Sequence, residues 1–184
     1  MKNYLIISLL FLSVGFSQKK KTDKPNPMKG VKTVTRLSYN YEEKFGELEE
    51  SSGTSTTFNL DSNGNEVESL TYDSDGSLNG KGIKKYDSNG NEVESLKYGS
   101  DGSLYDKRTD KYDSSGNRVE ITRYDSGGSL EDKWKMKHDS KGNTVEQSIY
   151  KSEGLLNWKY TYKYDSNGNE VESLTYDSDG SLNG

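Results

Sequence analysis

The residues best suited to chemistry are a single histidine, many repeated carboxylates and a group of aromatic side chains. His138 is the only histidine, and it stands where Tyr86, Tyr112 and Tyr164 stand in other parts of the chain. An enzyme needs a nucleophile with a base, a pair of acids or a metal site. A lone histidine in the place of a tyrosine is better interpreted as a substitute aromatic residue. We therefore expect no catalytic site, no cofactor and no enzyme.

The carboxylates raise the question of calcium. Residues 61–64 and 73–76 read Asp-x-Asn-Gly and Asp-x-Asp-Gly, which is how Asp-rich calcium loops begin. An EF-hand loop also needs a bidentate glutamate at its twelfth position. That position is Tyr72 in the first segment and Lys84 in the second. We expect no metal site of this type, and calcium bound across adjacent turn tips is retained as an alternative.

Aromatic side chains in the last third of the chain form the candidate ligand-binding surface. The residues are Trp134, Trp158, Tyr160, Tyr162 and Tyr176. Exposed aromatic rings stack on sugars or anchor protein partners, because such side chains dominate contact energies. The competing interpretation is that these rings only pack the array in which they lie.

The N-terminus has the features of an export signal. Lys2, the apolar run Tyr4–Phe16 and the small residue Ser17 indicate a secretory signal peptide over residues 1–17. The apolar run is shorter than the roughly 20 residues that a membrane span needs. A basic, proline-containing flexible linker follows at 18–30. We expect a protein that is secreted or at the cell surface, or periplasmic, with no membrane span after removal of the signal.

Composition limits the remaining function classes. The 184 residues are 28 % hydrophobic and 30 % charged, contain no cysteine and carry a formal net charge of −5. The low apolar content argues against a thick buried core. The lack of cysteine excludes disulfides and cysteine zinc sites. A mild, mixed charge argues against nucleic acid as a partner.

A 26-residue period organises the chain after the linker. Residues 61–80 recur letter for letter at 165–184, and Asp87, Asp113 and Asp139 open divergent versions between them. The period predicts five tandem repeats, at 60–85, 86–111, 112–137, 138–163 and, incomplete, 164–184, after a divergent half-repeat or cap at 31–59. The last repeat stops in mid-unit. Either the chain is a fragment, or its last strand presents an open edge for self-association.

Each repeat carries two turn signals. In Asp61-Ser62-Asn63-Gly64 the aspartate can accept a backbone N–H, and the glycine can adopt a positive φ. This pattern predicts a type I turn followed by a bulge at glycine, and residues 73–76 repeat it. Strands of about 8 and 10 residues fit between such turns. The expected fold is all-β, a tandem antiparallel β-hairpin meander forming an extended sheet or a spiral solenoid.

The hairpin model predicts a register. One kind of turn sets tyrosine opposite leucine, in the pairs Tyr72–Leu78, Tyr98–Leu104, Tyr124–Leu130, Tyr150–Leu156 and Tyr176–Leu182. The other sets lysine opposite valine, in the pairs Lys85–Val93, Lys111–Val119, Lys137–Val145 and Lys163–Val171. The two sets are expected on opposite faces. All the candidate aromatics then lie on the Tyr/Leu face, with Trp158 beside Tyr176, and Lys84 lies between Glu66 and Glu94.

The phrase Tyr86-Asp87-x-x-Gly90-Asn91, followed by a second tyrosine-containing turn, is similar to the YD repeats of the Rhs family. The resemblance covers Leu60–Gly184 and implies a secreted or surface β-hairpin spiral used as a shell, stalk or binding scaffold. Rhs units more often have Gly-Arg where this chain has Gly-Asn. We do not infer for this chain the functions of that family's enclosing shell or of its toxin. Leu78–Gly82 also resembles MORN-type repeats, and the chain resembles secreted tandem-repeat proteins of the Bacteroidota.

These observations predict an exported, non-enzymatic repeat protein that acts as a structural scaffold or interaction module at the cell surface. Two alternatives remain open. One is a module that binds a surface glycan or a protein through the late aromatics, and the other is a calcium-stiffened, adhesin-like stalk.

Overall fold

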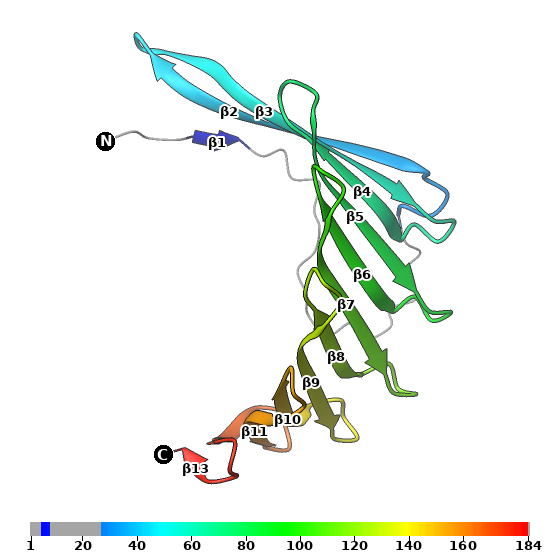
Figure 1. Ribbon diagram of the computed structural model, residues 1–184, viewed down its shortest axis with the longest axis vertical. Helices are drawn as coiled ribbons and strands as arrows, with labels where there is room; N and C mark the ends of the chain where they lie inside the picture. The colour runs from blue at the N-terminus through cyan, green and yellow to red at the C-terminus, as the bar shows by residue number, and fades with distance from the viewer. Residues whose placement is uncertain (1–4, 8–26, 184) are drawn as a thin grey trace. The chain divides into compact units, whose positions relative to one another are not determined.

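The computed structural model describes residues 5–7 and 27–183, and in these residues the chain forms strands and turns and no helix. Thirteen strands lie in sequence order in one open antiparallel sheet (Figure 1). The strands are β1 (Leu5–Ile7), β2 (Thr33–Lys44), β3 (Glu47–Leu60), β4 (Glu66–Tyr72), β5 (Leu78–Tyr86), β6 (Glu92–Gly99), β7 (Leu104–Tyr112), β8 (Arg118–Tyr124), β9 (Leu130–His138), β10 (Thr144–Lys151), β11 (Leu156–Tyr164), β12 (Glu170–Tyr176) and β13 (Leu182–Asn183). The all-β hairpin meander is confirmed.

The chain divides into two compact units. The first contains Met1–Ile83 with Gly99–Gly102, and the second contains Lys84–Tyr98 with Ser103–Gly184. In the first unit, the segment expected to be a divergent cap is the long hairpin β2–β3, whose turn residues Phe45 and Gly46 have φ values of 54° and 87°. Three residues of the predicted signal peptide form β1, which pairs with β2. The rest of that peptide and residues 18–26 of the predicted linker lie outside the described residues.

The predicted turn geometry is confirmed in the repeats. At the first turn the Gly64 N–H donates to the Asp61 carbonyl at 3.0 Å, and Gly64 has a φ of 81°. The second turn of the repeat is alike, with the Gly76 N–H bonded to the Asp73 carbonyl at 3.0 Å and a φ of 82°. A positive φ is the conformation that glycine adopts without steric cost, which explains its place in every turn.

The turn aspartates bond in two different ways. Asp61 Oδ1 accepts the N–H groups of Asn63 and Asn65, each at 2.9 Å, and Oδ2 accepts the Asn65 side-chain amide at 3.0 Å. The same three bonds recur at the equivalent residues Asp87, Asp113, Asp139 and Asp165. In the second turn the expectation for Asp73 is wrong. Asp75 accepts the Ser77 N–H there, and Asp73 accepts the side-chain amide of the following asparagine.

Half of the predicted register is correct. All five tyrosine–leucine pairs form. Three of the four lysine–valine pairs do not, because Lys111 lies opposite Glu120, Lys137 opposite Glu146, and Lys163 opposite Glu172. At each of these turns the register shifts by one residue, so Val119 and the equivalent valines have no residue opposite them. One extra residue in one strand is a β-bulge.

The shifts overturn the expected assignment of side chains to faces, because a one-residue slip moves every following side chain to the other side. A second register shift lies next to each of these tyrosine–leucine pairs, between the tyrosine and the residue before it, as between Thr71 and Tyr72. In the first unit Leu70 therefore lies opposite Lys81, and Glu68 lies opposite Ile83. The residues expected on separate faces share one face.

The sheet of the second unit has two faces with different residues. The lysine face carries Lys107, Lys111, Glu120, Thr122, Tyr124, Lys133, Lys135, Lys137, Glu146, Ser148, Tyr150, Lys159, Lys163, Glu172 and Tyr176. The divergent face carries Lys97, Asp106, Arg108, Asp110, Ile121, Arg123, Asp132, Trp134, Met136, Gln147, Ile149, Trp158, Tyr160 and Tyr162.

Burial agrees with a single layer. Among the residues whose burial is described, no hydrophobic side chain is buried, and the three buried residues are Asp110, Thr122 and Ser148, with 3 %, 4 % and 6 % exposure. The short side chains of Thr122 and Ser148 lie among the longer lysines and tyrosines of the lysine face. The stems of those lysines can cover neighbouring surface while their ammonium groups stay in water.

The turn geometry gives a direct test at Gly90, which has a φ of 82° and no atom within 4 Å of the position that a Cβ would occupy. We expect Gly90→Val to lower the free energy of unfolding by about 1–3 kcal/mol, because a β-branched residue is strained there. Gly90→Asn should cost less, since asparagine tolerates a positive φ. Urea unfolding measures both, and equal stability of the valine variant and the parent would contradict the turn assignment.

Candidate functional site

The lysine face is built around one repeated glutamate. Glu120 on β8 lies 2.8 Å from Lys111 Nζ on β7 and 4.0 Å from Lys133 Nζ on β9. Glu146 is held in the same way by Lys137 at 2.8 Å and Lys159 at 3.0 Å. Hydrogen bonds from Lys111 and Lys137 lower the pKa of Glu120 and Glu146, respectively, below the usual 4.5. The lysines are exposed at their tips, so each pair contributes little alone and the ladder acts through its repetition.

The expected position of Glu94 is corrected by this ladder. Glu94 binds Lys85 at 2.5 Å and Lys107 at 4.0 Å, and so occupies the same place in its repeat as Glu120. Lys84 instead lies 3.9 Å from Glu92, on the other side of the strand.

Tyrosines accompany the glutamates on the lysine face. Lysine Nζ atoms lie over their rings: Lys107 is 5.1 Å from the Tyr124 ring centre, and Lys135 is 5.4 Å from that of Tyr150. Contacts of this kind contribute roughly 0.5–1 kcal/mol at exposed sites.

His138 has the structural role of the tyrosines that it replaces. The Tyr112 hydroxyl donates to the Glu92 carbonyl at 3.0 Å, and the Tyr164 hydroxyl donates to the Thr144 carbonyl at 2.9 Å. His138 Nε2 makes the equivalent bond to the Arg118 carbonyl at 2.8 Å. A carbonyl oxygen only accepts, so Nε2 carries the proton. In each case the ring joins its own repeat to the preceding one.

The divergent face differs from repeat to repeat. The position of Trp134 is occupied by Gly82, Arg108 and Tyr160 in the other repeats, whereas the lysine-face position next to it is lysine in all four, at Lys81, Lys107, Lys133 and Lys159. The position of Met136 is likewise Lys84, Asp110 or Tyr162. The repeats thus keep lysine, glutamate and tyrosine at fixed positions of the lysine face, whereas the divergent face lacks such a constant set at the positions of Trp134 and Met136. The lysine face varies at other positions, as in Leu96, Thr122, Ser148 and Leu174.

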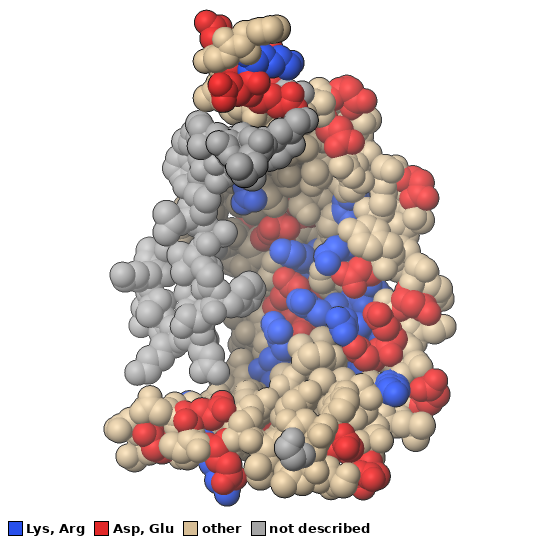
Figure 2. Space-filling model, turned by 90° about the vertical axis from the view of Figure 1, so that its left-hand side faces the viewer, with Lys and Arg blue, Asp and Glu red and all other residues tan. Residues whose placement is uncertain are grey.

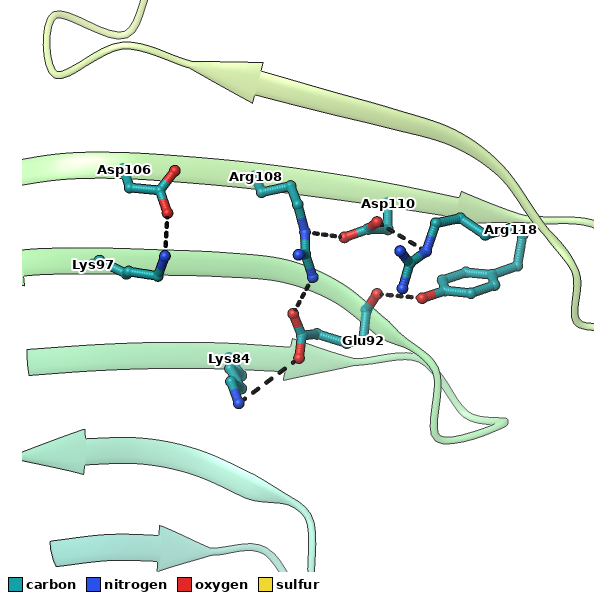
Figure 3. A network of polar contacts seen from close by, with 8 residues as sticks. Lys84, Glu92, Lys97, Asp106, Arg108, Asp110 and Arg118 are labelled. Carbon is teal, nitrogen blue, oxygen red and sulfur yellow. Dashed lines mark hydrogen bonds and ion pairs between the residues drawn. The ribbon is translucent and has the colours of Figure 1, made fainter. Parts of the chain in front are cut away.

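A network of charges occupies the β6–β8 part of the divergent face (Figure 3). Asp110 lies between two arginines, 2.8 Å from Arg108 Nε and 3.1 Å from Arg118 Nε, and its side chain is fully buried. Arg108 also reaches Glu92 at 2.5 Å. Figure 2 shows basic and acidic side chains gathered close together on the face that it presents. Because these charges neutralise one another, the network orders the strands and leaves little net charge.

The β8–β11 part of the divergent face carries a straight row of apolar side chains. Ile121 lies opposite Trp134, Trp134 opposite Ile149, and Ile149 opposite Trp158. All four are half-buried. We call these four residues the tryptophan row.

Polar groups border the row on one side. Arg123 and Asp132 form a two-bond ion pair, in which Arg123 Nε lies 2.9 Å from Asp132 Oδ1 and a terminal nitrogen binds Oδ2. The hydrogen bonds from Arg123 lower the pKa of Asp132 below 3.8. The Arg123 guanidinium also lies 5.8 Å from the Trp134 ring centre.

On the other side of the row lie Met136, Gln147 and Tyr160, with Tyr162 one step further along β11. Burial, followed by the charge of Glu170, raises the pKa of Tyr162. Tyr162 also borders an open groove of about 490 Å³ between the turns at residues 139–141 and 165–166.

The structure therefore divides the five predicted site residues. Trp134, Trp158, Tyr160 and Tyr162 share the divergent face. Tyr176 lies on the lysine face opposite Lys159, so the expected pairing of Trp158 with Tyr176 is wrong by one residue. Trp158 lies on the other face, where it is opposite Ile149.

Sequence reasoning missed the Arg123–Asp132 pair and the isoleucines of the row. The signal that could have found them is the position-by-position comparison of the repeats, in which one set of positions stays constant while the other changes.

The turn carboxylates do not form a cation site in the described part of the chain. No group of three or more histidine, cysteine, aspartate or glutamate side chains that could hold a metal lies within residues 5–7 and 27–183. At the turns beginning with Asp61 and its equivalents, both carboxylate oxygens accept N–H groups of the turn. The alternative of calcium at the turn tips gains no support from this geometry.

No family model matches the chain, and no curated protein matches it. The solved structures that resemble it include a porin-like protein from Bacteroides uniformis, at 13 % identity and a TM-score of 0.43 over 78 % of this chain and 77 % of the other.

They also include TcdB2-TccC3-TEV, at 12 % identity and a TM-score of 0.30 over 80 % of this chain, and the Photorhabdus luminescens Tc holotoxin pore, at 12 % and 0.30 over 79 %. This chain spans 11 % of each of those two. Similarities of this size do not transfer a name or an activity. Within the described strands and turns there is no helix long and apolar enough to cross a membrane.

The carboxylates give a pH prediction. Bonds to Asn91 lower the pKa of Asp87 below 3.8, and lysine bonds lower the pKa values of Glu120 and Glu146 below 4.5. A folded-state pKa below the unfolded value gives stability that is present above the unfolded pKa and is lost as pH falls through the folded one. We expect a constant free energy of unfolding from pH 7 to about 5 and a steady fall below that. Urea unfolding across this range, with Asp87→Asn showing a weaker fall, provides the test.

His138 gives a prediction about the links between repeats. His138→Tyr should keep or raise stability, because tyrosine makes the same bond in neighbouring repeats. His138→Phe keeps a ring but no donor, and should cost about 0.5–1.5 kcal/mol. Denaturant unfolding at neutral pH measures the difference, and a phenylalanine variant as stable as the tyrosine variant would show that the bond is unimportant.

Proposed function

We propose that the protein is an exported, non-enzymatic interaction module of the cell surface. The repeated sheet is the scaffold, and the divergent face of the second unit is the surface that contacts a partner. The observation that carries this proposal is the contrast between the faces: lysine, glutamate and tyrosine recur on one, while the other changes from glycine to arginine, tryptophan and tyrosine at a single repeat position.

The constancy of the lysine face has a physical reason. Glu94, Glu120 and Glu146 each bind lysines from both neighbouring strands, so a change at one of these positions removes contacts on two sides. Stability of a repeat array is a sum of such neighbour terms. The contacts of the divergent face, such as that of Asp110 with Arg118, are made by residues particular to one repeat. Their variation is expected where contact with a partner sets the choice of side chain.

The side chains gathered on the divergent face suit binding. Trp134, Trp158 and Tyr160 are only half-buried, although aromatic side chains provide most of the contact energy where they meet a partner. Structural contacts already account for His138 and for the repeated glutamates, and for this reason we assign them no catalytic role.

The proposal is tested by changing the two faces separately. A triple variant, Trp134→Ser with Trp158→Ser and Tyr160→Ser, should keep its circular dichroism and lose about 1 kcal/mol or less per substitution. It should no longer be retained on the envelope fraction of the cells that export the protein. The matched lysine-face variant, Lys133→Ser with Tyr150→Ser and Lys159→Ser on β9, β10 and β11, should lose more stability and keep retention at a temperature where it is folded.

Two results would contradict the proposal. Undiminished retention of the divergent-face variant would show that this face is not the contact surface. Its unfolding under native conditions would show that the aromatics pack the array.

A further inference from the structure

The tryptophan row has a regular spacing across the sheet. Trp134 on β9 and Trp158 on β11 both lie in register with Ile149 on β10. Neighbouring strands are about 4.8 Å apart, so the two tryptophans, two strands apart, are separated by about 10 Å. Ile121 extends the row to β8. The row therefore runs at right angles to the strands.

The borders of the row are polar on both sides. The paired Arg123 and Asp132 lie along one side, and Gln147 and Tyr160 lie along the other. Together these groups supply donors and acceptors in the plane beside the rings. The two charges form a neutral pair, so they favour a ligand with many hydroxyl groups over a polyanion.

We propose that the tryptophan row binds a neutral, extended β-1,4-linked polysaccharide that runs across the strands, with alternate sugars stacked on Trp134 and Trp158. This inference rests on the proposed function, because it names the ligand of the same face. A β-linked sugar ring presents a face of C–H groups that stacks on an aromatic ring, while its hydroxyl groups project at the edge. The separation of the two tryptophans corresponds to the two-sugar repeat of such a chain.

The open position of the row on the sheet favours a polysaccharide over a protein, because its four side chains are only half-buried. The anchor residues of protein partners fill pockets, and the open groove near these strands lies at the turns around Asp139 and Asp165, beyond the row. A row of half-exposed side chains with polar borders matches a ribbon of sugars.

The test measures tryptophan fluorescence. Trp134 and Trp158 are the only tryptophans of the chain, so their emission reports on the tryptophan row alone. The purified protein is titrated with β-1,4-linked oligomers of glucose, xylose and mannose, from two to six sugars long. We expect at least one series to change the emission, with affinity rising at least tenfold from two sugars to three, the shortest length that reaches both rings. The α-1,4-linked glucose hexamer has the same sugar without the extended shape, and should bind at least tenfold more weakly than the best β-linked hexamer.

Variants locate the effect. Trp158→Ala should lower affinity for the best hexamer at least tenfold and remove the dependence on chain length, with Trp134 still reporting by its emission. Trp158→Tyr keeps a flat ring and should retain most of the affinity. Tyr176→Ala, on the lysine face, is the matched control and should leave affinity unchanged.

The outcomes separate the two proposals. If the divergent-face triple variant loses envelope retention but none of the β-linked series binds, the polysaccharide assignment is overturned and the proposed function stands. If a hexamer binds equally to the parent and to Trp158→Ala, the tryptophan row is not its site. If envelope retention is unaffected by the triple variant, the proposed function itself fails.

Discussion

A sheet of one layer must be stabilised by contacts between neighbouring strands, and this constraint governs the whole molecule. No second layer covers either face within the described residues, and no hydrophobic side chain is buried there. Glutamates that bind two lysines, lysines over tyrosine rings and a ring-to-carbonyl bond between repeats take the place of a core. Each contact is modest, and each joins one strand to the next.

The same constraint explains why the two faces differ in how much their residues vary from repeat to repeat. The lysine face joins its strands through contacts that recur from repeat to repeat, whereas the divergent face joins them through pairs that differ between repeats, such as Arg123 with Asp132. Glycine, arginine, tryptophan and tyrosine can then follow one another at equivalent positions without disturbing the strands that hold them. Even the buried Asp110 fits this account, because it is paired locally with Arg108 and Arg118 and not with a repeated partner. The recurring contacts of the lysine face and the variable residues of the divergent face thus occur on the two sides of one single-layer sheet.

Much of the fold could be predicted because its determinants are local. Asp61 and Gly64 fix a turn within four residues, and the tyrosine–leucine pairs follow directly from it. The face assignment failed because Val119 and its equivalents add one unopposed residue just beyond the turn. Nothing in the valine itself indicates a bulge. The candidate site suffered the same error: Trp134 and Trp158 were found by residue type, whereas the Arg123–Asp132 pair was missed and Tyr176 was placed on the wrong side.

The two register shifts in each repeat have an implication for how such a chain can lengthen. Together they return every side chain to its starting orientation after one full period, as the recurrence of Glu94, Glu120 and Glu146 on the lysine face demonstrates. Duplication of an entire period inserts an even number of strands, so all later segments keep both their direction and their orientation. Duplication of half a period would reverse them. Genetic expansion in whole periods can therefore multiply contact surfaces without any redesign of the framework.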